Sequence, residues 1–130
     1  MMKTIVRLML VFMLIFVAAP AYAGEAIQMW KCEMHDDTTE EEVTAMAKEW
    51  LTAAKKVKGG ERLEAYVYFP VAVNVSGETD VWFVVVAPSF AEWGQFWDNY
   101  PDSPAAELED RQNEKVVCPD SALWESEKVK

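Results

Sequence analysis

The chain has 130 residues, 52% of them hydrophobic, and its 22 acidic residues outnumber 12 basic ones, for a formal charge of −10. This length suits a single domain with one modest core. The acidic excess repels nucleic-acid phosphates and anionic membrane surfaces, so neither is expected as a partner of the mature protein.

Residues 1–23 are typical of a secretory signal peptide. Lys3 and Arg7 provide a basic start, Leu8–Ala19 is an uninterrupted apolar run, and an Ala-Tyr-Ala cleavage site follows. The run is shorter than the roughly 20 residues that span a bilayer. We therefore expect an exported protein, periplasmic or secreted, whose mature chain is one domain over residues 24–130. That chain keeps ten basic and 22 acidic residues, a formal charge of −12.

The mature chain begins with a predicted strand and a predicted helix. Ala26–Met34 has the apolar, β-favouring content of a strand. Thr39 and Glu42 fit a capping box, which predicts a helix start. Gly59 and Gly60 supply its stop after three lysines in the last turn. The apolar stripe between these signals has helical spacing: Val43, Met46, Ala47, Trp50, Leu51, Ala54 and Val57.

Two further strands are predicted next. Alternation of apolar and polar residues predicts a long strand over Arg62–Val75, with Pro70 indicating a sheet edge or bulge. A turn over residues 74–79 follows. Asp80–Ala87 is continuously apolar, which predicts a strand buried on both faces.

An aromatic helix follows. Ser89 and Glu92 resemble a capping box, so we expect a helix from Phe90 that breaks at Pro101. Its aromatics cannot all share one stripe, and we expect three to pack against the sheet (Phe90, Trp93, Trp97) while Phe96 or Tyr100 lies at the rim. Ser103 and Pro104 predict a second short helix through Gln112. Strand character returns at residues 116–118 and 123–124.

The resulting order is β-α-β-β-α-β, a ferredoxin-like α+β fold with a four-stranded antiparallel sheet. In that topology the fourth strand pairs with the first, and the spatial order is fourth, first, third, second. Cys32 at the end of the first strand then lies beside Cys118 at the start of the fourth. In an exported protein this pair predicts a disulfide. The competing interpretation, a metal site at Cys32-x-x-His35, rests on a weak spacing signal.

This order, together with the segments WFVVVAPSFAEWGQFW and VVCPDSALWESEKV, resembles the dimeric α+β barrel group. The resemblance covers nearly all of residues 26–129. It implies a homodimer whose sheets close a barrel, often around a small-molecule pocket. Members of the group include cofactor-free monooxygenases, haem-degrading enzymes, haem peroxidase relatives and many proteins with no shown activity.

The candidate ligand-binding residues lie on the strand face expected to point away from the helices. Glu64, Tyr66 and Tyr68 alternate with the aliphatic side of the second strand, and we add Trp82 and Trp30, whose strands are apolar on both faces. Two interpretations stay open: a dimer interface alone, because Tyr and Trp are enriched at interfaces, or an interface that also encloses a ligand pocket.

No catalytic residue, metal or cofactor is assigned. The lone histidine, His35, stands among acidic residues and is expected to be solvated. We favour an exported, non-catalytic homodimer that binds a small apolar or aromatic ligand. The alternative is a cofactor-independent, monooxygenase-like enzyme acting on an aromatic small molecule, with Glu64 as its candidate base.

Overall fold

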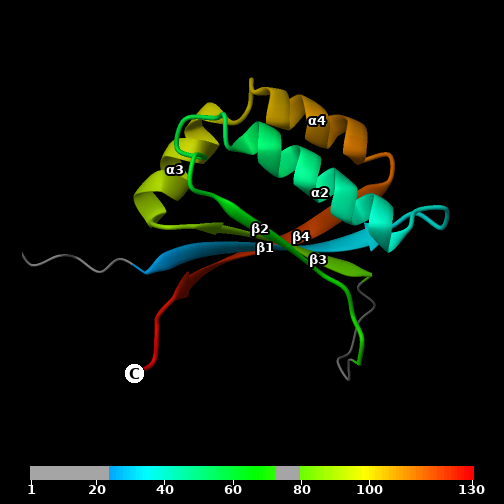
Figure 1. Ribbon diagram of the computed structural model, residues 1–130, viewed down its shortest axis with the longest axis horizontal. Coiled ribbons are helices and arrows are strands. Elements are labelled where there is room, and N and C mark those ends of the chain that lie inside the picture. Colours follow the sequence, from blue (N-terminus) through cyan, green and yellow to red (C-terminus); the bar gives the residue numbers. More distant parts are fainter. Residues whose placement is uncertain (1–23, 73–79) are drawn as a thin grey trace, which may run out of the picture.

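A single antiparallel sheet carries three helices on one of its faces (Figure 1). The computed structural model describes residues 24–72 and 80–130. The expected signal peptide and the expected turn over 74–79 lie outside the described residues. The elements are, in chain order, β1 (Glu25–Met34), α2 (Glu40–Ala54), β2 (Glu64–Tyr68), β3 (Val81–Ala87), α3 (Phe90–Asn99), α4 (Pro104–Gln112) and β4 (Val116–Ser126).

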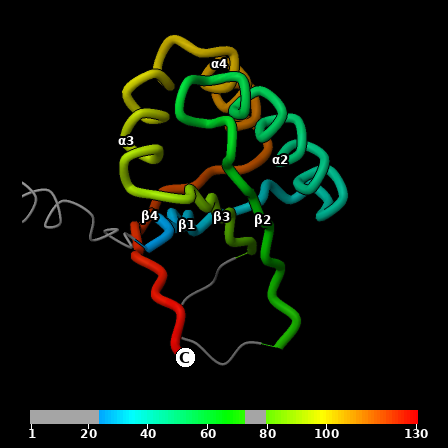
Figure 2. The backbone as a smooth tube through the Cα atoms, turned by 60° about the vertical axis from the view of Figure 1, so that its left-hand side comes forward, coloured from blue at the N-terminus to red at the C-terminus, as the bar shows by residue number. Residues whose placement is uncertain are grey.

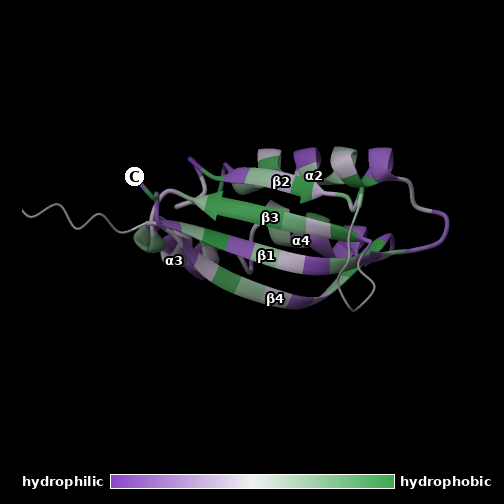
Figure 3. Ribbon diagram, turned by 90° about the horizontal axis from the view of Figure 1, so that it is seen from below, coloured by the Kyte–Doolittle hydropathy of each residue, from purple (hydrophilic) through white to green (hydrophobic). Residues whose placement is uncertain are grey.

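The strand order is β2-β3-β1-β4, which confirms the order predicted from the sequence. All three strand pairs are antiparallel, and Trp30 at the centre of β1 stands opposite Phe83 in β3 and Ser121 in β4. Figure 3 looks onto the sheet from the side without helices and shows β3 hydrophobic along most of its length. The ferredoxin-like fold of the sequence analysis is therefore present, with two consecutive helices, α3 and α4, before the last strand.

A disulfide joins Cys32 of β1 to Cys118 of β4, as predicted. The two Cα atoms lie 4.0 Å apart although 86 positions separate them in sequence. The β1–β4 register shifts between Lys31 and Glu33, opposite the part of β4 that contains Pro119. Proline has no N–H to donate to a ladder, which explains the irregularity at this position.

The helix starts follow the local signals. Thr39 and Glu42 form the reciprocal capping box of α2, and the Oγ of Ser89 accepts the N–H of Glu92 at the start of α3. Helix α2 ends at Ala54, earlier than expected, and a short turn leads to Gly59. Gly59 has a φ of 91°, a conformation that favours glycine.

Strand β2 is shorter than the sequence indicated. The predicted strand of Arg62–Val75 is wrong beyond Tyr68, because pairing with β3 ends where Tyr68 stands opposite Trp82. Pro70 stands two residues later and could not continue the ladder. Residues 73–75 of the predicted strand lie outside the described residues.

The expectation that β3 is buried on both faces is wrong at Trp82. This residue is 36% exposed, whereas Val81, Val84 and Val85 are buried. The three helices cover only one face of the sheet, so alternate side chains of β3 meet either the core or the uncovered face.

The aromatic helix packs differently from the prediction. Phe96 is fully buried and Tyr100 is 7% exposed, so neither lies at the rim. The other three aromatics of α3 are partly buried against the same core. A Cβ added to Gly59 would lie 2.5 Å from the Phe96 nitrogen, which shows that the glycine turn after α2 packs directly onto α3 and covers Phe96.

Removing the disulfide should destabilise the fold strongly. The bridge closes a long loop, and the chain-entropy model gives about 4 kcal/mol for such a loop. We expect the variant with Cys32→Ala and Cys118→Ala to lose about that much free energy of unfolding, measured by urea denaturation. Reductant should lower the free energy of unfolding of the wild type by a similar amount. Two freely reactive thiols in folded, unreduced protein would contradict the bridge.

Candidate functional site

A cavity of about 380 Å³ lies between the sheet and the helices α2, α3 and α4, beside the disulfide. Exposed side chains at its lining, Glu109, Asn113 and Val117, indicate that it opens to solvent near α4 and the start of β4. Most of the lining is apolar, and the complete set is Trp30, Cys32, Val43, Met46, Ala47, Trp50, Val81, Phe83, Trp97, Glu109, Gln112, Asn113, Val116, Val117 and Cys118.

Four aromatic side chains form a continuous wall of this cavity. The ring of Trp30 lies 5.7 Å from that of Phe83 and 5.9 Å from that of Trp97. Trp50 meets Phe83 edge to face at 5.2 Å. These separations are those of favourable aromatic pairs, so the wall is held by its own packing as well as by the sheet and helices behind it.

A hydrogen-bonded chain runs from the wall to the lining carboxylate. The Nε1 of Trp50 donates to the hydroxyl of Tyr100 at 2.9 Å, and that hydroxyl donates to Oε2 of Glu109. Burial, reinforced by the Glu109 hydrogen bond, raises the pKa of Tyr100 well above its usual range. Tyr100 therefore stays neutral and keeps Glu109 in place at the cavity wall.

Trp97 differs from Trp50 and Trp93 in that its indole N–H has no hydrogen-bond acceptor. Its Nε1 is buried and has no hydrogen-bond partner, alone among buried side-chain nitrogens and oxygens of residues 24–72 and 80–130. Trp50 donates to Tyr100, and Trp93 donates to Oε1 of Gln28 at 2.9 Å. The Nε1 has almost no accessible surface, so protein atoms enclose it, although Trp97 is one of the residues that line the cavity.

The face of the sheet opposite the helices, called the open face below, carries most of the residues predicted to bind a ligand. Directly paired residues of antiparallel strands point to the same side. The pairing therefore gives the open face three rows of side chains that cross the sheet from β2 to β4. The first row is Glu64, Val86, Ile27 and Trp124. The second is Tyr66, Val84, Met29 and Ala122, and the third is Tyr68, Trp82, Lys31 and Asp120.

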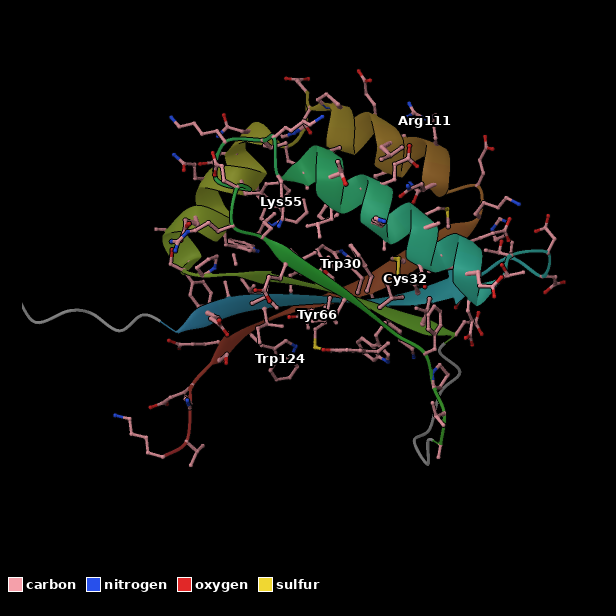
Figure 4. All side chains as sticks on the ribbon, viewed as in Figure 1. Trp30, Cys32, Lys55, Tyr66, Arg111 and Trp124 are labelled. Carbon is pink, nitrogen blue, oxygen red and sulfur yellow. A yellow bond between two sulfur atoms is a disulfide. The ribbon has the colours of Figure 1, made fainter. Side chains whose placement is uncertain are left out.

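On this face Tyr66 and Tyr68 stack, with ring centroids 6.2 Å apart, and are 42% and 50% exposed. The Tyr66 hydroxyl donates to Oε2 of Glu64 at 2.5 Å, which raises the pKa of Tyr66. Figure 4 shows Tyr66 and Trp124 on the side away from the helices. Trp124, 58% exposed, belongs to the open face although the sequence analysis assigned it no role there.

Trp30 does not belong with these residues, which corrects the sequence-based grouping. It stands opposite Phe83, packs against the helix-side core and lines the cavity. Figure 4 shows it between the sheet and the helices. The apolar content of its strand left the orientation open, and the register with β3 decides it. Glu64, Tyr66, Tyr68 and Trp82 do share one face.

The helix-side cavity was missed in the sequence. The sequence analysis places Trp50, Phe83 and Trp97 only in apolar stripes or strands, and it assigns Glu109 no role. An aromatic residue at helical spacing gives the same pattern whether it contacts another side chain or an open cavity. The acidic Glu109 on a helix that follows an aromatic helix is a signal too weak to have located the site.

Within the described parts of the chain, no three His, Cys, Asp or Glu side chains gather in a way that would hold a metal ion. His35 is exposed, and its backbone N–H donates to the carbonyl of Lys115. None of the helices in residues 24–72 and 80–130 is long and apolar enough to cross a membrane.

The sequence matches no protein-family profile and no curated protein. Its fold resembles solved structures. One is a protein of Arabidopsis thaliana, with a TM-score of 0.56 at 12% identity, covering 82% of this chain and 98% of that one. A dimeric ferredoxin-like protein of unknown function from Thermobifida fusca gives 0.47 at 14% identity, covering 82% and 93%. A mutant chlorite dismutase from Candidatus Nitrospira defluvii gives 0.47 at 15% identity, and this chain covers only 43% of it.

At these identities the similarities concern the fold alone. The topology is the ferredoxin-like one predicted from the sequence, and the Arabidopsis structure resembles this fold. They transfer no activity, since proteins that share this architecture have unrelated functions.

Replacing Tyr100 by Phe should lower stability by about 1–3 kcal/mol, because the buried N–H of Trp50 loses its acceptor. The pH dependence should change as well. The folded-state pKa of Tyr100 is raised above its ordinary value of 10.0, so its contribution is present below about pH 10 and is lost as pH rises further. Urea denaturation should therefore show that the free energy of unfolding falls more steeply at alkaline pH in the wild type than in Tyr100→Phe.

Tyr68→Phe, at an exposed position, should change stability by less than about 0.5 kcal/mol. Equal stability of both variants at neutral pH would refute the buried hydrogen bond.

Proposed function

We propose that this protein is an exported, non-catalytic homodimer that binds a small apolar or aromatic molecule in the cavity between its sheet and helices. The observation that carries the proposal is the cavity of about 380 Å³ with its wall of Trp30, Trp50, Phe83 and Trp97. A volume of this size lies within the usual range for small-molecule sites, about 300–1,000 Å³.

The chemistry of the lining favours a flat, uncharged ligand. Aromatic faces and edges offer stacking and dispersion contacts to a planar molecule. Glu109 is the one carboxylate of the lining, and the acidic surface of the chain adds to its repulsion of anions. An anionic ligand would therefore be disfavoured relative to a neutral one of the same shape.

The open face supports the homodimer part of the proposal. Tyr66, Tyr68, Trp82 and Trp124 leave a large apolar patch on a single chain, and soluble monomers rarely expose one. Figures 1 and 2 show the chain after β2 and the C-terminal residues both extending to this side, where they would flank a second copy. A two-fold dimer would place the same patch of each chain against the other.

A cofactor-independent monooxygenase-like activity is the alternative. Such an enzyme needs a general base within reach of its substrate. Glu64, the base considered from the sequence, lies on the open face and is not one of the residues that line the cavity. Glu109 lines the cavity beside the Tyr100 hydroxyl, so it would be the base of an enzyme built on this site.

Filling the cavity should abolish ligand binding. Ala47 lines the cavity from α2, and Ala47→Phe places a ring in its space. With methyl naphthyl ketone as the probe, we expect equilibrium dialysis to show at least tenfold weaker binding, with the dimer and melting temperature retained. Glu64→Gln and Tyr66→Phe, on the open face, are the matched controls and should bind as the wild type does. The opposite pattern would place the ligand between the paired sheets, which is one of the two interpretations that the sequence left open for Glu64, Tyr66, Tyr68 and Trp82.

A charge on the open face should weaken the dimer. Trp82→Glu buries a carboxylate at the proposed interface, and we expect sedimentation at micromolar concentration to shift from twice the monomer mass toward the monomer. Ala45→Glu makes the same charge change on the exposed surface of α2 and should leave the mass unchanged. A wild-type protein that sediments as a monomer would rule out this assembly.

A further inference from the structure

The mouth of the cavity is formed in part by the last turn of α4 and the residue that follows it. Glu109, Gln112 and Asn113 supply the carboxylate and amide side chains of the lining, and none of the described lining residues is a lysine, arginine or histidine. Arg111, the basic residue of the same turn, is exposed and does not line the cavity. Because the C-terminal end of a helix also carries a partial negative charge, the mouth is electronegative.

The carboxylate of Glu109 has one oxygen committed to the protein and one that is not. The hydroxyl of Tyr100 donates to Oε2, and the same hydroxyl accepts the Nε1–H of Trp50 at 2.9 Å. This chain holds the carboxylate two hydrogen bonds away from the aromatic wall. In residues 24–72 and 80–130, no protein donor is bonded to Oε1, and no lysine or arginine pairs with Glu109. Glu109 is exposed, so a molecule at the mouth can reach its side chain.

The acceptor strength of Glu109 exceeds that of the amides beside it. Nε2 of Gln112 donates to the carbonyl of Met46 at 3.1 Å, which ties this amide to α2. An ionised carboxylate only accepts hydrogen bonds, and a bond to a charged acceptor is roughly twice as strong as one between neutral groups. Glu109 is therefore the group of the mouth that best distinguishes a ligand with a donor from one without.

We propose that the preferred ligand of the cavity carries an O–H or N–H donor at one end of a flat apolar body, and that Glu109 determines this specificity by accepting the donor. The inference rests on the proposed function, since it names the ligand class of the same cavity. The body of the ligand lies against Trp30, Trp50 and Phe83, and its donor points to the mouth, where Oε1 accepts the hydrogen bond. A ketone or ether oxygen at that place would face another acceptor.

Two probes of nearly equal shape test the donor. Naphthol carries a hydroxyl group, and methylnaphthalene, substituted at the same carbon, has a methyl group there instead. Equilibrium dialysis of both probes against the wild type and Glu109→Gln gives a double-mutant cycle. Glutamine keeps a carbonyl oxygen for the Tyr100 hydroxyl and places an NH₂ group where Oε1 stood. We expect the ratio of naphthol to methylnaphthalene affinity to fall about two- to tenfold in this variant.

Glu107→Gln is the matched control. It makes the same chemical change on the same helix, at an exposed residue that does not line the cavity. The affinity ratio and the melting temperature should be those of the wild type. An equal fall of the ratio in both variants would show that it reports the loss of a charge from α4, and would overturn the role of Glu109.

A measurement on the wild type keeps the test independent of how Glu109→Gln folds. Nuclear magnetic resonance of protein with isotope-labelled glutamate follows the side-chain carboxyl carbons, and the Glu109 signal is the one that is missing in Glu109→Gln. Naphthol should shift this signal, because its hydroxyl donates to the carboxylate. Methylnaphthalene should shift it much less.

The outcomes separate the two proposals. If both probes bind, but the affinity ratio is unchanged in Glu109→Gln and the Glu109 signal responds equally to both, the role of Glu109 is wrong while the cavity remains a binding site. If naphthol, methylnaphthalene and methyl naphthyl ketone all fail to bind at saturating concentration, the ligand-binding function itself fails, and the specificity inference fails with it.

Discussion

The organisation of this protein depends on a sheet that its own helices cover on one face only. Because strand side chains alternate between faces, each strand divides its residues between two environments. On one side Trp30, Phe83 and Val85 meet the helices, and on the other Tyr66, Trp82 and Trp124 remain exposed in the single chain. The candidate binding cavity and the candidate interface between two copies are therefore separated by the thickness of one sheet.

The packing of the helices explains why a cavity remains on the covered face of the sheet. The glycine turn after α2 presses against α3 and buries Phe96, so this part of the layer is tightly filled. Toward the disulfide, α2 and α4 approach each other, with the Gln112 side chain bonded to the Met46 carbonyl, and the cavity lies beneath them. Trp50 belongs to both regions, since it packs on Phe96 and also lines the cavity.

Polar groups at the cavity follow from the same packing. Tyr100 is held among Trp50, Phe96 and Trp97, and its hydroxyl links Trp50 to Glu109. This chain satisfies the donor of one tryptophan and leaves the donor of another, Trp97, without an acceptor.

The sequence by itself determined the local elements and their order. Thr39, Ser89 and Ser103 each mark a helix start by accepting a hydrogen bond from a backbone N–H three residues later. The β-α-β-β-α-β order predicted the strand arrangement and the Cys32–Cys118 bridge. Only the tertiary structure decided which face Trp30 occupies, that Phe96 is buried, and that a cavity exists. Those outcomes depend on strand register and on how helices distant in sequence pack together, and apolar periodicity carries no information about either where both faces of a strand or helix are apolar.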